Sequence, residues 1–110
     1  MPHFMLQMKY SREAVKAMVA HPQDRRKAAV AALQGIGGKL LGFYYTFGDS
    51  DVLAIYEAPD ATSAIALSLA LGASGAASDV KTTPLVTMEE ALAAMKQAGK
   101  AGASYKPPKG

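Results

Sequence analysis

The sequence predicts a single α+β domain, in which strands and helices follow one another along 110 residues. Three observations lead to this class. Residues 3–10 alternate apolar and polar side chains with period two, as a half-buried strand does. Residues 39–57 form two strand-like runs joined by a short polar segment, which is typical of a hairpin. Residues 60–75 and 87–98 begin with helix-start signals and continue as alanine-rich apolar runs.

The N-terminal third is predicted to be one strand and two helical segments. In the strand, Phe4, Leu6, Met8 and Tyr10 point to one face, and His3, Met5, Gln7 and Lys9 point to the other. Ser11 is the expected N-cap of the first helix. Proline is disfavoured inside a helix but suits its first turn, so the His21-Pro22 step predicts a second helix that starts at Pro22. The glycines at 37 and 38 are its stop signal.

The middle of the chain is predicted to be a β-hairpin. Strict alternation from Lys39 places Leu41, Phe43, Tyr45 and Phe47 on one face and Leu40, Gly42, Tyr44 and Thr46 on the other. In the second run, Val52, Ala54 and Tyr56 alternate with Leu53 and Ile55. The segment Gly48-Asp49-Ser50-Asp51 joins the two runs, and we expect it to turn the chain.

The remaining elements are a helix, a strand and a final helix. Asp60 is the expected N-cap of the segment "ATSAIALSLALGASG". The segment "SDVKTTPLVT" reads as a strand, and its internal Pro84 places it at a sheet edge or a bulge. Thr87 and Glu90 match a capping box, which opens the last helix.

The order of strand, helix, strand, strand, helix, strand is the split βαβ plan of the ferredoxin-like fold, here followed by a C-terminal helix. In that plan the helices cover one face of the sheet. Both faces of residues 40–47 carry large apolar side chains, so the second face also needs a cover. Pairing of two copies through their sheets is the simplest cover. The helix after Asp60 has almost no polar side, which indicates a further subunit contact. We therefore expect a homodimer or a higher homo-oligomer.

The segments "GGKLLGFYYTFGDSDVLAIYEAPD", "LALGASG" and "VKTTPLVT" resemble the GYD family, small bacterial proteins of the dimeric α/β-barrel group. The resemblance spans about residues 3–95. At the hairpin, Gly48 and Asp51 match the family pattern of Gly, any residue, Tyr, Asp, whereas Ser50 stands in the place of the tyrosine. The resemblance implies fold and dimerisation, and it implies function only by analogy with barrels that hold small organic ligands. The sequence does not specify what the replacement by Ser50 changes.

Composition and charge limit the partners. Residues 1–98, the expected ferredoxin-like GYD-type domain, hold nine Lys or Arg and nine Asp or Glu. The formal charge of +3 therefore comes from Lys100, Lys106 and Lys109 in residues 99–110, which we expect to form a flexible basic tail. A neutral body without a basic stripe argues against nucleic acid as the main partner. Arg25-Arg26-Lys27 is interpreted as an ordinary solvated helix face.

The sequence contains no cysteine, which excludes disulfides and thiol chemistry, and a cytoplasmic location is the default expectation. The longest apolar stretch, residues 64–72, is shorter than the roughly 18 to 20 residues that span a bilayer, so no membrane partner is expected. The two histidines lack the spacing of a helical metal site. We expect neither a metal nor a cofactor.

The candidate site residues are few. Asp51 either hydrogen-bonds the turn or serves a pocket as a ligand anchor or a base. His21 at the helix break either caps a helix or acts as a proton donor or acceptor at a pocket mouth. Tyr10, Tyr44 and Tyr45 either fill the core or line a cavity. We expect a largely apolar pocket between sheet and helices, lined in part by these tyrosines, with His21 and Asp51 as polar groups.

The function expected from these residues is binding of a small organic molecule by an oligomeric protein. One alternative is a cofactor-free isomerase or oxygenase that acts on an aromatic or enolisable substrate, with His21 and Asp51 as catalytic residues. A structural assembly protein with a partner-docking tail is a second alternative. Removal of Met1 would also expose a Pro2 amine, which is similar to the base of the tautomerase superfamily, although the hairpin fits that group less well. The residues decide neither the ligand nor whether the protein is an enzyme.

Overall fold

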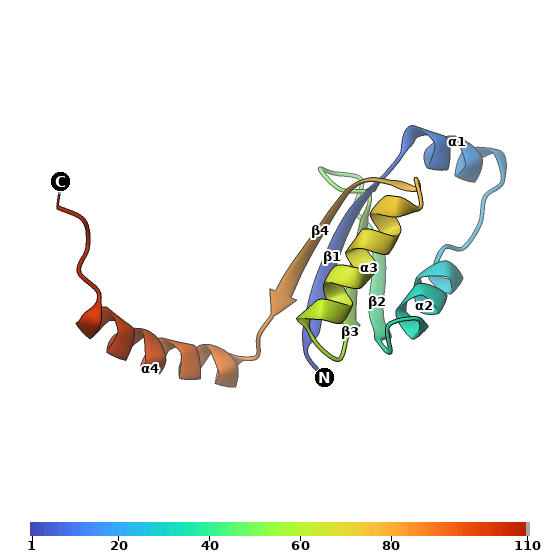
Figure 1. The fold of residues 1–110 in the computed structure, drawn as a ribbon. Helices are drawn as coiled ribbons and strands as arrows, with labels where there is room; N and C mark the ends of the chain where they lie inside the picture. The colour runs from blue at the N-terminus through green and yellow to red at the C-terminus, as the bar shows by residue number, and fades with distance from the viewer. Residues whose placement is uncertain (110) are drawn as a thin grey trace.

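A computed structural model describes residues 1–109 and confirms the α+β class. The elements are β1 (His3–Tyr10), α1 (Arg12–Ala20), α2 (Arg26–Gln34), β2 (Lys39–Tyr45), β3 (Val52–Glu57), α3 (Ala61–Ala73), β4 (Ala77–Leu85) and α4 (Met88–Ser104). The strands form one antiparallel sheet in the order β2-β3-β1-β4, which is the ferredoxin-like order. Figure 1 shows α2 and α3 on one face of this sheet, α1 at the end of β1 on the same side, and α4 leading away on the other.

The core lies between the sheet and its helices. The alternation predicted for β1 is confirmed, because its even-numbered residues are buried and its odd-numbered residues are not. β3 matches it, and antiparallel pairing places Leu6 opposite Ala54 and Phe4 opposite Tyr56. The rings of Phe4 and Tyr56 stack with centroids 5.6 Å apart. The helices cover this core on their side of the sheet, with Leu33 from α2 and with Ala64 and Leu67 from α3.

Strict alternation was wrong for β2. The register slips between Leu40 and Gly42, so a bulge at Leu41 shifts the strand by one residue. Leu40 pairs with buried Tyr56 and packs against the core, whereas Leu41 is exposed. After the bulge, Phe43 and Tyr45 pair with buried Ala54 and Val52, so they lie on the face that the helices cover and share one face as predicted. A period-two pattern cannot reveal an inserted residue when the side chains on both sides of it are leucines.

The predicted helix starts are largely confirmed. Ser11 and Asp60 cap α1 and α3 through their side chains, and Thr87 forms the expected capping box with Glu90. α2 begins at Arg26 rather than at Pro22, because the Asp24 carboxylate accepts a hydrogen bond from the Arg26 amide and turns the chain there.

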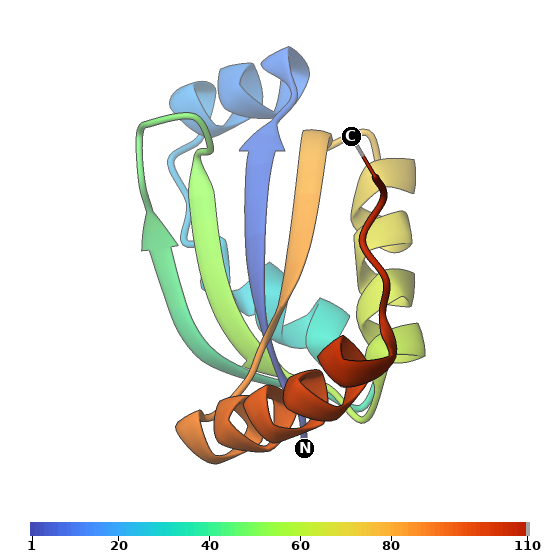
Figure 2. The same cartoon turned by 90° about the vertical axis from the view of Figure 1, so that its left-hand side faces the viewer.

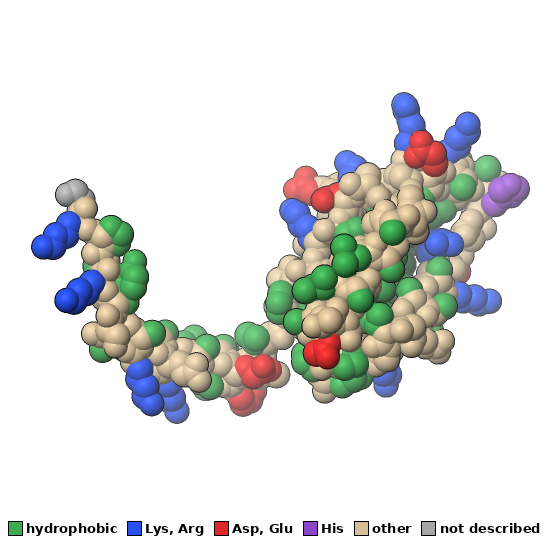
Figure 3. Space-filling view, in the orientation of Figure 1, with side chains coloured by type: hydrophobic (Ala, Val, Ile, Leu, Met, Phe, Trp, Pro, Cys, Tyr) green, Lys and Arg blue, Asp and Glu red, His purple; other side chains and the backbone are tan. Residues whose placement is uncertain are grey.

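α3 is apolar on its outer side as well. Ile65 and Leu69 are exposed, and Figure 3 shows hydrophobic side chains gathered along the visible side of this helix. In the part of the chain that the structure describes, no helix is long and apolar enough to cross a membrane. The exposed apolar side chains on the outer side of α3 therefore belong to a helix that is too short to cross a membrane.

α4 gives the chain an extended shape. The helix continues to Ser104, beyond the end predicted near residue 98, and none of its residues is buried. The radius of gyration is 17.7 Å, whereas a compact chain of this length has about 13 Å. The long dimension of the molecule is 58 Å, and Figure 3 shows α4 projecting from the body as an arm.

Gly38, at the junction of α2 and β2, tests how closely this junction approaches β3. A Cβ on Gly38 would lie 2.5 Å from the carbonyl oxygen of Glu57, which is backbone and cannot rotate away. We expect Gly38→Ala to lower the free energy of unfolding by about 1–3 kcal/mol, as overpacking does. Gly72→Ala is the control, because a Cβ there meets nothing within 4 Å and alanine gains about 0.5–1 kcal/mol inside a helix. Urea denaturation measures both changes, and equal stability of the two variants would contradict the assigned contact.

Candidate functional site

A cavity of about 250 Å³ lies between the covered face of the sheet and helices α2 and α3. Strands β1, β2 and β3 form its floor, and the two helices form its walls. Its lining is almost entirely apolar, with Leu6, Met8 and Val52 on the floor and Leu67 and Leu71 on the α3 side. This is the place where the sequence predicted a pocket.

The cavity exists because small residues face it. Ala28, Ala29 and Ala32 line it from α2, and Ala54 lines it from β3. Leu33 is the only α2 residue that is buried in the core. Since protein interiors are otherwise close-packed, an apolar space of this size is the candidate binding site of the fold.

One polar group in the cavity wall has no partner. The hydroxyl of Tyr56 is buried and has no hydrogen bond. The nearby Thr82 hydroxyl is hydrogen-bonded to Ser68 instead. Burial raises the pKa of Tyr56, and the Thr82 hydroxyl, which lies near the phenol but beyond hydrogen-bond distance, offsets part of the rise. A buried hydroxyl without a partner costs about 1–3 kcal/mol, so a ligand acceptor at this position would remove that cost.

A second polar group lies where β1 ends. Tyr10 lines the cavity, and its ring meets the ring of Tyr45 at a centroid distance of 6.5 Å. Burial raises the pKa of Tyr10 to about 12, the Tyr45 hydroxyl adds to the rise, and the Arg25 guanidinium opposes it. At neutral pH the Tyr10 phenol is therefore a protonated hydrogen-bond donor.

Arg25 brings a positive charge to the cavity. It is the residue before α2, it is half-buried, and it lines the space next to Tyr10. Its Nη1 donates to the Gln23 side chain at 3.0 Å. The neighbouring carboxylate is already engaged, because Asp24 pairs with Arg26 at 2.6 Å and its pKa falls to about 2 for that reason. Within residues 1–109, Arg25 has no carboxylate within 4 Å.

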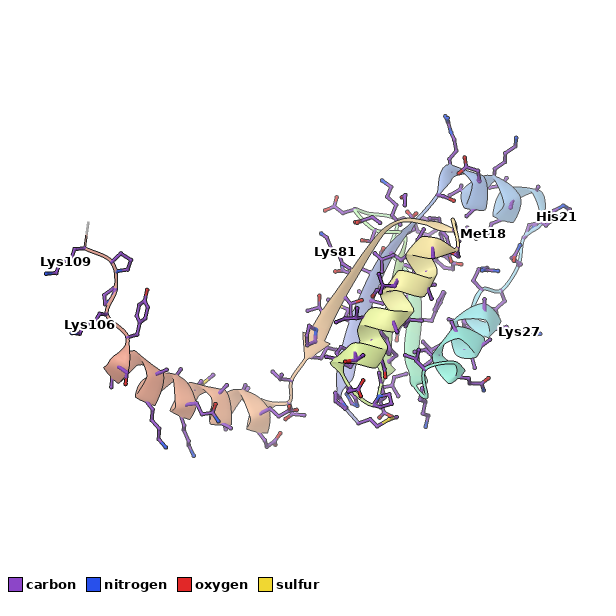
Figure 4. All side chains as sticks on the ribbon, in the orientation of Figure 1. Met18, His21, Lys27, Lys81, Lys106 and Lys109 are labelled. Atoms are coloured by element: carbon purple, nitrogen blue, oxygen red, sulfur yellow. The ribbon has the colours of Figure 1, made fainter. Side chains whose placement is uncertain are left out.

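The predicted site residues separate into two groups. Tyr10 lines the cavity, and the Tyr45 ring packs against the Tyr10 ring at one end of the cavity. Tyr44 lies on the opposite face of the sheet, where its ring covers Gly42 at 3.1 Å from the position of a Cβ. His21 is exposed after α1 and points away from the body, as Figure 4 shows. The structure does not bring His21 and Asp51 together at the cavity.

Asp51 joins the hairpin to the first strand. Its Oδ2 accepts a hydrogen bond from the Tyr10 amide at 2.9 Å, and its own amide donates to the Met8 carbonyl at 2.9 Å. The hairpin turn itself is closed by backbone hydrogen bonds such as that from Thr46 to Asp51. Asp51 therefore links two segments that are 41 residues apart, and its hydrogen bond fixes the backbone of Tyr10.

Sequence reasoning did not place Arg25 or Tyr56 at the cavity, which both residues line. Arg25 was interpreted as part of a solvated basic cluster, and only the fold shows that its side chain turns towards the sheet. Tyr56 had a usable signal, because its alternation with Val52 and Ala54 places all three on the buried face. Within the described residues, no group of three or more His, Asp or Glu side chains is placed to hold a metal ion.

The fold and the cavity define an α+β protein with a ferredoxin-like sheet and an apolar internal site. Comparison with protein families agrees, because the GYD domain matches residues 4–95. The chain therefore belongs to the GYD domain family, as the hairpin residues indicated. No curated protein matches it.

The buried Tyr10 phenol predicts a loss of stability at alkaline pH. Between pH 10 and pH 12 the unfolded Tyr10 has lost its proton and the folded Tyr10 has kept it. The folded state then binds more protons, so the free energy of unfolding falls as pH rises, by roughly 1–3 kcal/mol from this group. In urea titrations, Tyr10→Phe should remove this part of the slope. Parallel stability curves for the two proteins from pH 9 to pH 11.5 would contradict the assignment.

A structural role for Asp51 predicts a graded effect on stability. Asp51→Ala leaves the Tyr10 amide without its acceptor and should cost about 1–3 kcal/mol. Asp51→Asn keeps an acceptor oxygen and should cost less. Thermal denaturation at pH 7 measures both variants, and an alanine variant as stable as the unmodified protein would show that the hydrogen bond contributes nothing.

Proposed function

We propose that the protein binds a small, mostly apolar organic molecule that carries one anionic group such as a carboxylate or an enolate. The observation that carries this proposal is the Arg25 guanidinium, which lies beside the Tyr10 phenol at an otherwise apolar cavity and has no carboxylate partner in the described chain. A guanidinium in that setting favours an anion, because charge-assisted hydrogen bonds are stronger than neutral ones.

The apolar part of the ligand fits the rest of the cavity. Side chains such as Leu67 and Phe43 offer contacts to a ring or a short branched chain. Burial of apolar surface contributes roughly 25 cal/mol for each Å². The volume of about 250 Å³ lies just below the range of about 300–1,000 Å³ for drug-sized ligands, so one or two rings are the expected size. An acceptor atom at the far end of the ligand would pair with Tyr56.

Binding is favoured over catalysis by the kinds of residue present. Among the described residues that line the cavity there is no His, Asp, Glu or Lys. An isomerase or a cofactor-free oxygenase needs a proton acceptor beside the substrate. Tyr10, with a pKa of about 12, is a poor acceptor near neutrality. We therefore rank the enzymatic alternative with His21 and Asp51 below binding. We further propose a cytoplasmic location, supported by the absence of cysteine.

A direct titration with a fluorescent probe tests the proposal. The probe is 2-naphthoate, and the uncharged comparison is 2-acetylnaphthalene, which has a similar shape. We expect saturable binding of 2-naphthoate at pH 7 to the full chain. Arg25→Gln should weaken it about 10- to 100-fold, because a hydrogen bond to a charged group is worth about 1.5–3 kcal/mol. The same substitution should change binding of the ketone much less.

The matched control is Arg26→Gln, which removes a charge from the adjacent residue. Arg26 pairs with Asp24 and does not line the cavity, so affinity for 2-naphthoate should stay within about twofold, less than 0.5 kcal/mol. Ala29→Phe fills the cavity and should abolish binding of both probes. Equal effects of Arg25→Gln and Arg26→Gln, or binding that survives Ala29→Phe, would refute the proposed site.

A further inference from the structure

A row of aromatic rings continues from the wall of the cavity to the tip of the β2–β3 hairpin. Phe43 and Tyr10 line the cavity, and the centroid of the Tyr45 ring lies 5.7 Å from the first ring and 6.5 Å from the second. The Phe47 ring stacks on the Tyr45 ring, with the centroids 6.1 Å apart and the planes 24° from parallel. Tyr45 and Phe47 do not line the cavity themselves, so these two rings extend its aromatic wall beyond its end.

The two outer rings of the row are open to solvent. The exposed fraction is 87% for Phe47 and 44% for Tyr45, whereas it is 7% for Tyr10. Figure 2 shows the hairpin at the end of the sheet where β1 meets α1, and Tyr10 is the last residue of β1. Exposure therefore falls from ring to ring between the hairpin tip and the cavity, beside which Arg25 lies.

The backbone at Phe47 is strained. Its φ is 49°, and within positions 1–109 every other residue with a positive φ is a glycine. This left-handed conformation costs free energy in a bulky residue. Gly48 would adopt it freely, but among the described glycines the positive φ angles belong to Gly37 and Gly75. The strain thus falls on an exposed ring, which gains little from burial in return.

Hydrogen bonds on both sides of Phe47 hold it in this conformation. The Thr46 amide donates to the Asp51 carbonyl at 3.0 Å, and the Gly48 amide donates to the Ser50 carbonyl at 3.2 Å. The Thr46 hydroxyl also donates to the Ser50 carbonyl. Strained residues that the surrounding structure fixes in this way cluster at ligand sites and switch regions. The hairpin therefore holds the Phe47 ring ready for a contact that the isolated chain does not make.

We propose that Tyr45 and Phe47 form an outer subsite for an aromatic ring of the ligand. This inference rests on the function proposed above, and it narrows the ligand class to anions with two separate rings, of which the outer one is aromatic. The inner ring lies in the cavity, and the outer ring stacks on the exposed rings of the row. Aromatic rings prefer offset or edge-to-face contacts with centroids about 4.5–7 Å apart, and the rings of the row keep this spacing among themselves.

Arg25 determines where the anionic group of such a ligand stands. The guanidinium lies beside the Tyr10 phenol, where the cavity meets the outer rings. A ligand that occupies both parts of the site therefore carries its anionic group between its two rings rather than at one end. N-phenylanthranilate has this arrangement, because its carboxylate lies next to the nitrogen atom that joins the second ring to the first.

Two anthranilates that differ only in the outer ring test the proposal. N-phenylanthranilate carries a flat aromatic ring, and N-cyclohexylanthranilate carries a saturated ring of similar size. Calorimetric titration of the full chain at pH 7 should show tighter binding of the phenyl compound by about 3- to 10-fold, as expected for one aromatic contact. Phe47→Leu should bring this ratio of affinities close to one, because leucine is apolar but has no ring. Phe47→Tyr should keep the ratio.

Tyr44→Leu is the matched control. Tyr44 is also an exposed ring of β2, at 61%, but it lies on the opposite face of the sheet, so its loss should leave the ratio unchanged. The cavity holds 2-naphthoate without the outer rings, and its affinity should change less than about twofold in Phe47→Leu. Phe47→Asn removes the ring and tolerates a positive φ, so the midpoint of urea denaturation should stay the same or rise.

The outcomes separate the outer subsite from the proposed function. If 2-naphthoate does not bind to the unmodified protein, the proposed function and the subsite both fail. If 2-naphthoate binds but the two anthranilates bind equally well, or if Phe47→Leu and Tyr44→Leu change the ratio alike, only the subsite is overturned. A lower urea midpoint for Phe47→Asn would mean that the ring serves the fold, and it would overturn the subsite as well.

Discussion

The central position of β1 is the constraint on which the rest of the structure depends. The strand pairs with β3 on one side and with β4 on the other, so its alternation fixes which face of the sheet is apolar and covered. Phe4 stacks on Tyr56, and Tyr10 reaches the end of the cavity from the same strand. Asp51 secures this arrangement by binding the Tyr10 amide. Helices α2 and α3 pack where this alternation has placed the apolar side chains.

Three features of the chain meet at the cavity. Alanines on α2 leave space unfilled, the Tyr56 hydroxyl has no partner, and Arg25 has no carboxylate in the described chain. The unfilled space and the unpartnered Tyr56 hydroxyl break general rules of packing and hydrogen bonding. Natural proteins break such rules at functional sites more often than elsewhere. Each feature alone would be an ordinary irregularity, but here they lie together at one cavity, which makes this cavity the candidate site.

The sheet separates the two unusual surfaces of the molecule. The cavity lies on the side of α2 and α3, whereas the opposite face of the sheet, which carries Tyr44, Leu53 and Ile55, and the direction of α4 lie on the other (Figures 1 and 2). A protein contact on that opposite face would therefore leave the cavity accessible.

The sequence by itself determined the features that depend on near neighbours. Helix caps at Ser11, Asp60 and Thr87, the alternation of β1 and β3 and the hairpin at residues 48–51 all rest on contacts within a few residues, and they were predictable for that reason. The family was also recognisable from three short segments of the sequence, and its domain matches residues 4–95.

Only the tertiary structure decided the site. The bulge at Leu41 depends on pairing with β3, and the hydrogen bond from Tyr10 to Asp51 spans 41 residues. Arg25 looked solvated because its neighbours in sequence are charged, yet the path of the chain from α1 into α2 turns it towards the sheet. Burial and pairing between distant segments set these properties, and a local pattern contains no information about which distant segment will be the partner.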